Sequence, residues 1–251
     1  MYKIPANTLF LGKNLVYVPQ CHSTSTLATE LSQKAETPEG TLIITDHQMA
    51  GRGQRGNRWE AQPGENLTFS LILKPNFLAP QNQFLLNQAF SLGILDYVSQ
   101  RLSLEVKVKW PNDVMVGDHK VCGILFENQV SGNDLRHAIV GIGLNVNQQT
   151  FQYPAAASLR QFSYQLYNLR EELELLLEAL EIRYLQLKQG KQEELKSEYL
   201  NNLYRRGQSH RFTHQENEFD GVIVGVDEAG RLRIKVDGDE KIFGVKQLTF
   251  L

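Results

Sequence analysis

The sequence KWPNDVMVGDHKVCGILFEN, residues 109–128, decides the fold. Apolar and β-branched residues fill Val114–Val116 and Val121–Phe126 within it, and a run of the same kind, Val106–Trp110, leads into it. Gly117–Asp118 stands between Val114–Val116 and Val121–Phe126, where a tight turn belongs. The three runs are therefore predicted to be strands of a compact β region.

The rest of the first two hundred residues mixes strand and helix signals. Ala138–Leu144 is predicted as a further strand of the β region, after a turn at residues 131–134 (SGND). Three strands are predicted toward the N-terminus: Asn14–Val18, Thr41–Thr45 and Asn66–Leu73. Helical spacing of apolar residues predicts three helices: Thr26–Lys34, Gln81–Leu102 and Leu169–Lys188. Because these signals alternate irregularly, the fold class is α+β rather than a strict βαβ repeat.

The helix predicted over Leu169–Lys188 has one apolar face. Its apolar positions recur at helical spacing: Leu169, Leu173, Leu176, Leu180, Tyr184 and Leu187. Its glutamates are expected to form a solvated outer face without a function: Glu171, Glu172, Glu174, Glu178 and Glu181.

The C-terminal tail changes character from about Gly207. Short strands with alternating apolar residues dominate there, separated by turns at residues 228–230 and 237–238. A small antiparallel β-barrel of about 45 residues is predicted, a size usual for such modules. The sequence therefore predicts two domains, residues 1–206 and 207–251.

Composition excludes several classes of protein. The 251 residues hold 26 Lys+Arg against 28 Asp+Glu, so the net charge of −2 argues against a nucleic-acid partner. Cys21 and Cys122 stand far apart and neither belongs to a CxxC motif, so no disulfide framework or cysteine zinc site is expected. No signal-peptide run and no stretch of roughly 18 apolar residues occurs, so a cytoplasmic protein without a membrane partner is expected. The oligomeric state stays open.

A glycine-rich basic loop, GRGQRG at residues 51–56, follows the strand predicted over Thr41–Thr45. It fits GxGxxG, but turn-forming residues follow it where a dinucleotide fingerprint needs a helix. A kinase glycine loop is also excluded, because no His-Arg-Asp or Asp-Phe-Gly motif occurs downstream. Two interpretations remain open for the loop alone: a mobile anion-binding loop or an exposed basic loop without a ligand.

A second cluster of polar residues, around Asn112–Asp113, helps to decide between the two interpretations of the loop. Asn112–Asp113 alone would be read as an ordinary β-turn. Together with the loop, however, four segments occur in order: GRGQRGNRW, KWPNDVMV, HKVCGILFEN and GIGLNVN. This ordered set resembles the biotin–protein ligases over most of residues 20–147, and the tail resembles that family's small C-terminal domain.

The resemblance implies a fold and a reaction. The fold would be the family's catalytic domain, related to class II aminoacyl-tRNA synthetases, with helices packed on a mixed sheet. The enzyme would join biotin to ATP as biotinyl-5′-adenylate, with Mg²⁺, and release pyrophosphate. It would then pass biotin to one lysine of a biotin carboxyl carrier protein domain of acetyl-CoA carboxylase type. The ligase pattern begins within about twenty residues of Met1, so the form expected lacks the N-terminal DNA-binding domain that some relatives carry.

The resemblance also implies site residues. The expected biotin contacts are Ser23, Thr24, Ser25, Gln48, Gly51, Arg52, Gly53, Lys120 and Gly123. The expected nucleotide contacts are Arg55, Trp59, Lys109, Asn112 and Asn145, and Asp113 and Asn145 are the expected magnesium ligands. Three positions depart from the family's usual pattern: Ser25 replaces a common asparagine, and Gln54 and Asn57 replace basic residues of the loop.

These residue types suit adenylation, which brings a carboxylate to an α-phosphate. Two anions must meet, so cations such as Lys120 and Arg52 are expected to carry the catalysis. Asp113 is the candidate general base that takes the proton of the carrier lysine in the second step.

Two rival functions are weighed against this one. A lipoate or octanoate ligase shares the chemistry, but a lipoyl chain needs apolar walls rather than the hydroxyl and amide groups of Ser23, Thr24 and Gln48. A non-catalytic binding module is the rival from another class, and the complete set of motif residues argues against it.

Overall fold

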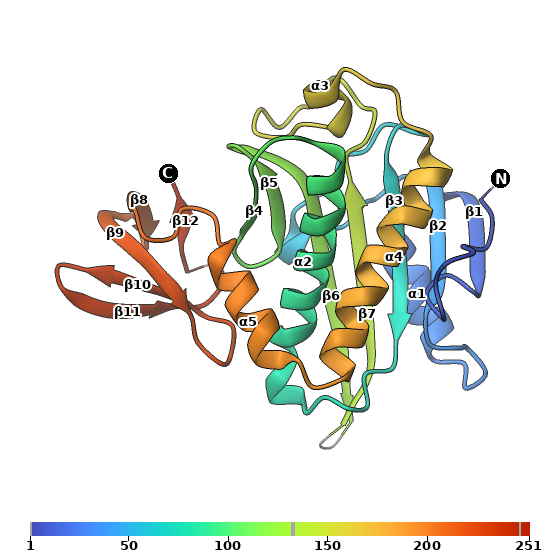
Figure 1. Cartoon of the computed structure of the whole chain (residues 1–251), viewed down its shortest axis with the longest axis horizontal. Helices are drawn as coiled ribbons and strands as arrows, with labels where there is room; N and C mark the ends of the chain where they lie inside the picture. The colour runs from blue at the N-terminus through green and yellow to red at the C-terminus, as the bar shows by residue number, and fades with distance from the viewer. Residues whose placement is uncertain (1, 132–133, 246) are drawn as a thin grey trace.

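The computed structural model describes residues 2–131, 134–245 and 247–251 (Figure 1). Its β-strands are β1 (Leu15–Cys21), β2 (Thr41–Gln48), β3 (Leu67–Leu73), β4 (Val106–Lys109), β5 (Asp113–Val116), β6 (His119–Ser131), β7 (Asp134–Leu144), β8 (Ser209–His214), β9 (Asn217–Val226), β10 (Leu232–Val236), β11 (Asp239–Phe243) and β12 (Thr249–Phe250). Its α-helices are α1 (Thr24–Ser32), α2 (Phe84–Arg101), α3 (Leu159–Ser163), α4 (Leu169–Lys188) and α5 (Gln192–Asn201). Short 3-10 turns η1 (Gln54–Gly56) and η2 (Pro80–Asn82) complete the elements of the described residues.

The first seven strands form one mixed sheet in the order β1-β2-β3-β7-β6-β5-β4. Strands β1 and β2 run parallel, and the other neighbours are antiparallel. Helices α2 and α4 lie side by side over one face of this sheet (Figure 1). Helix α1 contacts β2, β3 and β7, where Ala28 packs with Ile43 in a small separate core. The predicted α+β class with a mixed sheet is confirmed.

Alternation along the strands explains why both faces of the sheet are covered. In β2, Leu42 and Ile44 belong to the large core beneath α2 and α4, whereas Ile43 between them faces α1. Successive side chains of a strand point to opposite faces, so an unbroken apolar run needs cover on both sides. The run that predicted this strand is therefore also the reason that helices pack on both faces.

The predicted elements differ from the observed ones mainly at their ends. Strands β6 and β7 are longer than predicted, because they pair as a hairpin from Cys122 opposite Leu144 to Ser131 opposite Asp134. The turn predicted at residues 131–134 includes residues 132 and 133, which lie outside the described residues. Helix α5 was not predicted; Leu195 and Tyr199 are its only fully buried side chains, which is too weak a pattern to read from sequence.

The C-terminal tail is a sheet and not a closed barrel. Its five described strands follow the order β11-β10-β9-β8-β12, so β11 and β12 form opposite edges. Strand β12 covers only two residues, Thr249–Phe250, and pairs with β8. So short a strand offers too few backbone groups to close the sheet onto β11. The predicted barrel is therefore wrong, although its antiparallel strands are confirmed; the division into domains 1–206 and 207–251 stays a prediction.

Two glutamates of α4 contradict the expected solvated face. Glu172 is buried and accepts hydrogen bonds from Tyr97 Oη at 2.6 Å and Arg101 Nε at 2.8 Å. Glu181 is buried as well, and its carboxylate accepts from three successive backbone N–H groups at 2.6–2.9 Å: Leu9, Phe10 and Leu11. Glu181 therefore fastens the N-terminal segment to α4. No helix among the described residues is long and apolar enough to cross a membrane.

We expect Glu181→Ala to lower the free energy of unfolding by about 2–4 kcal/mol, because one buried and two part-buried N–H groups would lose a charged acceptor. Urea unfolding followed by circular dichroism measures this difference. Glu174→Ala on the same helix is the matched control, and its effect should stay within about 0.5 kcal/mol. Equal effects of the two substitutions would show that Glu181 does not anchor the segment.

Candidate active site

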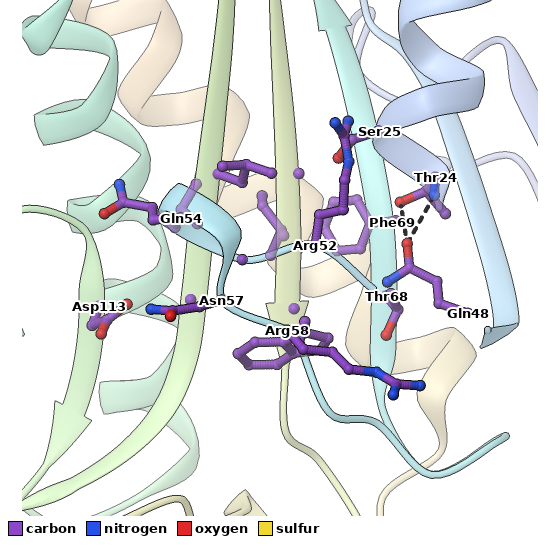
Figure 2. A pocket seen from close by; sticks show the side chains of 18 of the residues that line it. Thr24, Ser25, Gln48, Arg52, Gln54, Asn57, Arg58, Thr68, Phe69 and Asp113 are labelled. Carbon is purple, nitrogen blue, oxygen red and sulfur yellow. Dashed lines mark hydrogen bonds between the residues drawn. The ribbon is translucent and has the colours of Figure 1, made fainter. Parts of the chain in front are cut away.

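A small cavity of about 150 Å³ lies between α1, the end of β2, the loop of residues 51–59 and strands β6 and β7 (Figure 2). Its lining includes Thr24, Ser25, Gln48, Arg52, Gly53, Trp59, Asp113, Lys120, Gly123, Gly141 and Gly143. In Figure 2, Thr24 and Gln48 lie on one side of the cavity and Asp113 and Asn57 on the other. Thus the structure brings together segments that are about a hundred residues apart in the sequence.

One side of the small cavity carries a network of uncharged polar groups. Gln48 Oε1 accepts hydrogen bonds from Thr24 N at 2.8 Å and Thr24 Oγ1 at 3.1 Å (Figure 2). Ser70 Oγ lies 2.8 Å from Thr24 Oγ1 and 3.2 Å from Ser25 Oγ. Ser70 was missed from the sequence; its signal is a hydroxyl at the centre of the mostly apolar strand β3. Buried hydroxyls in such a network can redirect their hydrogen bonds to a polar ligand.

The opposite wall is formed by glycines because large groups approach the backbone closely. A Cβ atom on Gly143 would lie 2.2 Å from Trp59 Cε2, and a Cβ on Gly123 would lie 3.0 Å from Lys120 Nζ. A Cβ on Gly141 would lie 2.6 Å from Ser25 Oγ. These glycines of β6 and β7 therefore leave room for the indole of Trp59 and for the side chains of Ser25 and Lys120.

Trp59 closes the loop and half fills the site. Its backbone N–H donates to Gly51 O at 2.9 Å, and its indole lies on Gly143. The indole Nε1 is buried without a hydrogen-bond partner among the described residues. An unpaired buried N–H costs about 1–3 kcal/mol, so this group is available to an acceptor that enters the cavity.

The loop is held by its own backbone and by one ion pair. Gly53 N donates to Asn57 O at 2.7 Å, and Arg52 and Arg58 form an isolated antiparallel bridge. Arg52 Nη2 lies 2.7 Å from Glu127 Oε2 of β6, a half-exposed contact. Glu127 was not among the predicted site residues. The Arg55 side chain lies outside the part of the chain that the structure describes.

A second cavity, of about 1000 Å³, adjoins the first. Asp113, Lys120 and Trp59 line both cavities, and Lys120 Nζ lies 2.7 Å from Asp113 Oδ1. The larger cavity is also lined by Lys109, Asp118, Asn145, Tyr153, Arg205 and Phe250. Of these, Asp118, Tyr153, Arg205 and Phe250 were not predicted. Lys120 therefore stands at the junction of the two cavities.

A β-bulge aims Lys120 at this junction. Asp113 pairs with Gly123 and Met115 pairs with Lys120, with an irregularity between Val114 and Met115. Residues 120 and 123 would face opposite sides of a regular strand, but one extra residue on β6 turns both to the same side. Val121 and Cys122 are accordingly both buried in the core.

The amides and the second lysine have distinct surroundings. Asn112 is buried and its Nδ2 donates to Ile124 O, so its nucleotide contact stays a prediction. Asn145 Nδ2 donates to Ala157 O at 3.1 Å, whereas its Oδ1 is buried without a partner among the described residues. Burial lowers the pKa of Lys109, with a further lowering from Arg205 and Lys120 and an opposing effect of Asp113. The Lys109 ammonium also lies 4.9 Å from the ring centroid of Phe250.

The structure assembles most of the predicted site. Thr24, Ser25, Gln48, Arg52, Gly53, Trp59, Lys109, Asp113, Lys120, Gly123 and Asn145 line one or both cavities. Gly51 lines a hollow beside the loop, next to Arg52. Ser23 is buried at the N-cap of α1 and borders the site through its neighbours. Two adjoining cavities that share a cation are the arrangement of an enzyme that brings two substrates together.

Comparison with known proteins identifies the family. Residues 17–145 match the model of the biotin/lipoate A/B protein ligase family. The bifunctional ligase/repressor BirA of Bacillus spizizenii is 30% identical over 242 residues, which cover 94% of this chain and 74% of BirA. The chain belongs to the biotin/lipoate A/B protein ligase family.

Two further relatives are similar along most of their length. A biotin–[acetyl-CoA-carboxylase] ligase of Mycobacterium tuberculosis is 27% identical over 231 residues, covering 90% of this chain and 85% of that protein. The structure of biotin protein ligase from Aquifex aeolicus in complex with biotin and ATP superposes with a TM-score of 0.78 at 25% identity, covering 95% of this chain and 99% of that one. The likeness therefore includes the C-terminal sheet.

We expect Gly143→Ala to expel the Trp59 indole from the site, because the added Cβ would lie 2.2 Å from it. Tryptophan emission should shift to longer wavelength and become more accessible to acrylamide. The chain has two tryptophans, and Trp110 is buried. The matched control is Gly225→Ala in β9, where the nearest atom to the Cβ is Leu200 Cδ2 at an ordinary 3.4 Å. An unchanged spectrum, or a shift that persists with Trp59→Phe, would contradict this packing.

Proposed function

We infer that this chain is an ATP-dependent biotin–protein ligase, which activates biotin as biotinyl-5′-adenylate and transfers it to a lysine of a carrier protein. Family membership and the biotin ligases that match nearly the whole chain support this function. The observation that carries it is the position of Lys120, which lies where a small polar cavity meets a larger one.

The small cavity favours biotin over lipoate. Thr24, Ser25, Gln48 and Ser70 present hydroxyl and amide groups in one buried network. A ureido ring has two N–H donors and a carbonyl acceptor, which need such partners when they are buried. A lipoyl or octanoyl chain has no polar group to offer this network, so it would gain no hydrogen bond there and the sister activity is disfavoured.

Adenylation begins with attack of a biotin carboxylate oxygen on the α-phosphorus of ATP. A new oxygen–phosphorus bond forms, the bond to the bridging oxygen of the β-phosphate breaks, and pyrophosphate leaves. Lys120 at the junction would lie beside both anions and reduce their repulsion, and Lys109 in the larger cavity would neutralise phosphate charge. Arg52, which lines the small cavity, is the third proposed cation.

The larger cavity suits ATP with magnesium. The Asp113 carboxylate and the unpaired Asn145 Oδ1 provide oxygen ligands of the kind that Mg²⁺ prefers. Magnesium at these oxygens would neutralise phosphate charge. Among the described residues there is no cluster of three His, Cys, Asp or Glu side chains that holds a metal by itself, which fits an ion that enters with the nucleotide.

Transfer requires a neutral amine. The carrier lysine nitrogen attacks the acyl carbon of the adenylate, AMP leaves, and one amine proton must go to a base. Asp113 is the proposed base because its carboxylate lines both cavities. We propose a biotin carboxyl carrier domain of acetyl-CoA carboxylase type as the acceptor, in agreement with the name of the mycobacterial relative. A cytoplasmic location would supply the ATP.

We expect biotin, and neither lipoate nor octanoate, to drive exchange of labelled pyrophosphate into ATP with Mg²⁺. This measurement tests the first half-reaction and the identity of the acid together. Lys120→Gln should lower the exchange rate about 10²–10³-fold, because it removes one positioned charge. Exchange driven by lipoate would assign the sister activity instead, and no exchange with any of the acids would disprove the enzyme.

We expect the KM for ATP to rise on the alkaline side at a pH below that of an ordinary lysine. Burial lowers the pKa of Lys109 from 10.5, so this group loses its charge, and with it the attraction to phosphate, at lower pH. Lys109→Arg should remove this rise of the KM at high pH (the alkaline limb of the pH profile), because a guanidinium stays charged. The exchange assay run from neutral pH upward measures the effect. An identical alkaline limb in both proteins would exclude Lys109 as its origin.

A further inference from the structure

The segment Lys109–Asp113 has one side at the larger cavity and its other side against the C-terminal third of the chain. Lys109 and Asp113 line the cavity. Behind them, Val108 N donates to Asn202 O at 2.8 Å, Tyr204 N donates to Val108 O at 2.9 Å, and Tyr199 Oη donates to Pro111 O at 2.9 Å. The backbone of this segment is thus held by residues that do not enter either cavity, apart from Tyr204.

Trp110 makes the contact with the C-terminal sheet. Its side chain is 5% exposed, and its indole Nε1 donates to Gly230 O at 2.8 Å. Gly230 belongs to the turn that joins β9 to β10. Within this turn, Gly230 N donates to Asp227 O at 2.9 Å and Arg231 N donates to Asp227 Oδ1 at 2.8 Å. The acceptor of Trp110 therefore belongs to a turn with internal hydrogen bonds of its own.

The turn also lies directly on α2. Gly230 has φ +79°, and a Cβ at this position would lie 2.3 Å from the Phe84 ring. Phe84 is the first residue of α2 and packs edge-on against Tyr199, with ring centroids 5.8 Å apart. No space is left between the turn and α2, so the distance from the C-terminal sheet to Trp110 is fixed on both sides.

We propose that Trp110 and Gly230 are positioning residues for adenylation: docking of the Gly230 turn on Trp110 and Phe84 sets the placement of Lys109 and Asp113 at the nucleotide cavity. This inference rests on the proposed function. Lys109 and Asp113 are paired across β4 and β5, and Trp110 lies in the turn between them. A displaced Trp110 moves both groups that face ATP.

The effect is largest on the nucleotide side of the site. Strand β4 lies at one edge of the mixed sheet, whereas β2, which carries Gln48, is next to the opposite edge. Thr24 is hydrogen-bonded to both Gln48 and Ser70, away from the Gly230 turn. A shift at Trp110 therefore raises the KM for ATP strongly and changes the affinity for biotin much less, because Asp113 also lines the smaller cavity while the polar network of Thr24 and Gln48 stays in place.

The test compares Gly230→Ala with Gly238→Ala. Both glycines lie in turns of the same sheet at positive φ, +79° and +96°, so the backbone strain of an alanine is similar. A Cβ at Gly238 meets nothing within 4 Å, whereas one at Gly230 meets Phe84. We expect Gly230→Ala to raise the KM for ATP about tenfold in biotin-dependent exchange, equivalent to about 1.4 kcal/mol, while the Kd for biotin changes much less and Gly238→Ala changes neither.

Two further variants separate positioning from a loss of folding. Trp110→Phe keeps an aromatic ring but removes the N–H donor, and it should raise the KM for ATP in the same direction. Phe84→Leu combined with Gly230→Ala makes room for the new Cβ, so the KM of the double variant should fall below that of Gly230→Ala. A biotin affinity that falls as much as the ATP affinity would overturn the proposal, and so would a Gly230→Ala KM equal to that of Gly238→Ala.

Amide hydrogen exchange without substrates provides a readout that does not depend on the proposed function. The N–H of Val108 and its neighbours through Asp113 should exchange faster in Gly230→Ala than in Gly238→Ala, because the turn no longer holds Trp110. If the wild-type protein shows no biotin-dependent exchange of pyrophosphate into ATP, the proposed function is wrong. The amide hydrogen exchange of the two glycine variants still tests whether the Gly230 turn holds Trp110. Equal hydrogen exchange in both variants would overturn the docking itself.

Discussion

One cross-strand register builds the site. Lys109 lies opposite Asp113, Asp113 opposite Gly123, Gly123 opposite Gly143, and Gly143 opposite Thr68. This row crosses five neighbouring strands and carries, in order, the cation and carboxylate of the larger cavity and the glycine wall of the smaller one. A slip of one residue in any pair would turn every side chain of that strand to the other face. The core residues that alternate with this row fix the register of the strands, and they therefore also fix the positions of the site residues.

The same register explains why one part of the site is uncharged and another part is charged. The polar network of Thr24, Gln48 and Ser70 is uncharged and lies where α1 meets β2 and β3. The charged pair Lys120–Asp113 lies at the junction, half-buried, and Lys109 lies beyond it. If the uncharged ureido ring of biotin binds at the polar network, the biotin carboxylate would lie near Lys120. The α-phosphate of ATP would reach Lys120 from the larger cavity. Arg52 and Glu127 hold the loop over the smaller cavity by an ion pair at the rim.

The sequence alone predicted most of the secondary-structure elements and the residue types of the site. It did not predict which side chains contact one another. The ordered motifs carried the resemblance and contain Lys120 and Asp113, and the resemblance in turn implied Thr24 and Gln48 as site residues. Ser70 was missed since a hydroxyl in a mostly apolar strand is a weak signal that does not show which partners it meets. The bulge that turns Lys120 toward Asp113 depends on pairing between β5 and β6, which periodicity within one strand does not reveal. Burial of Glu172 and Glu181 and the open C-terminal sheet likewise depend on partners distant in sequence.

The segment Lys109–Asp113 shows why its three central residues do not line the cavities that Lys109 and Asp113 line. Alternation in β4 gives Lys109 to the cavity and Val108 to the core, and the chain then turns at Trp110 and Pro111 before Asp113 returns to the cavity. A turn of this kind has few backbone partners within the sheet, so its position has to be fixed from outside. Trp110 Nε1 and Pro111 O obtain such partners from Gly230 and Tyr199. The motif thus carries cavity-lining residues on one side and a docking surface for the C-terminal sheet on the other, and the proposed positioning role of this contact would link that sheet to adenylation.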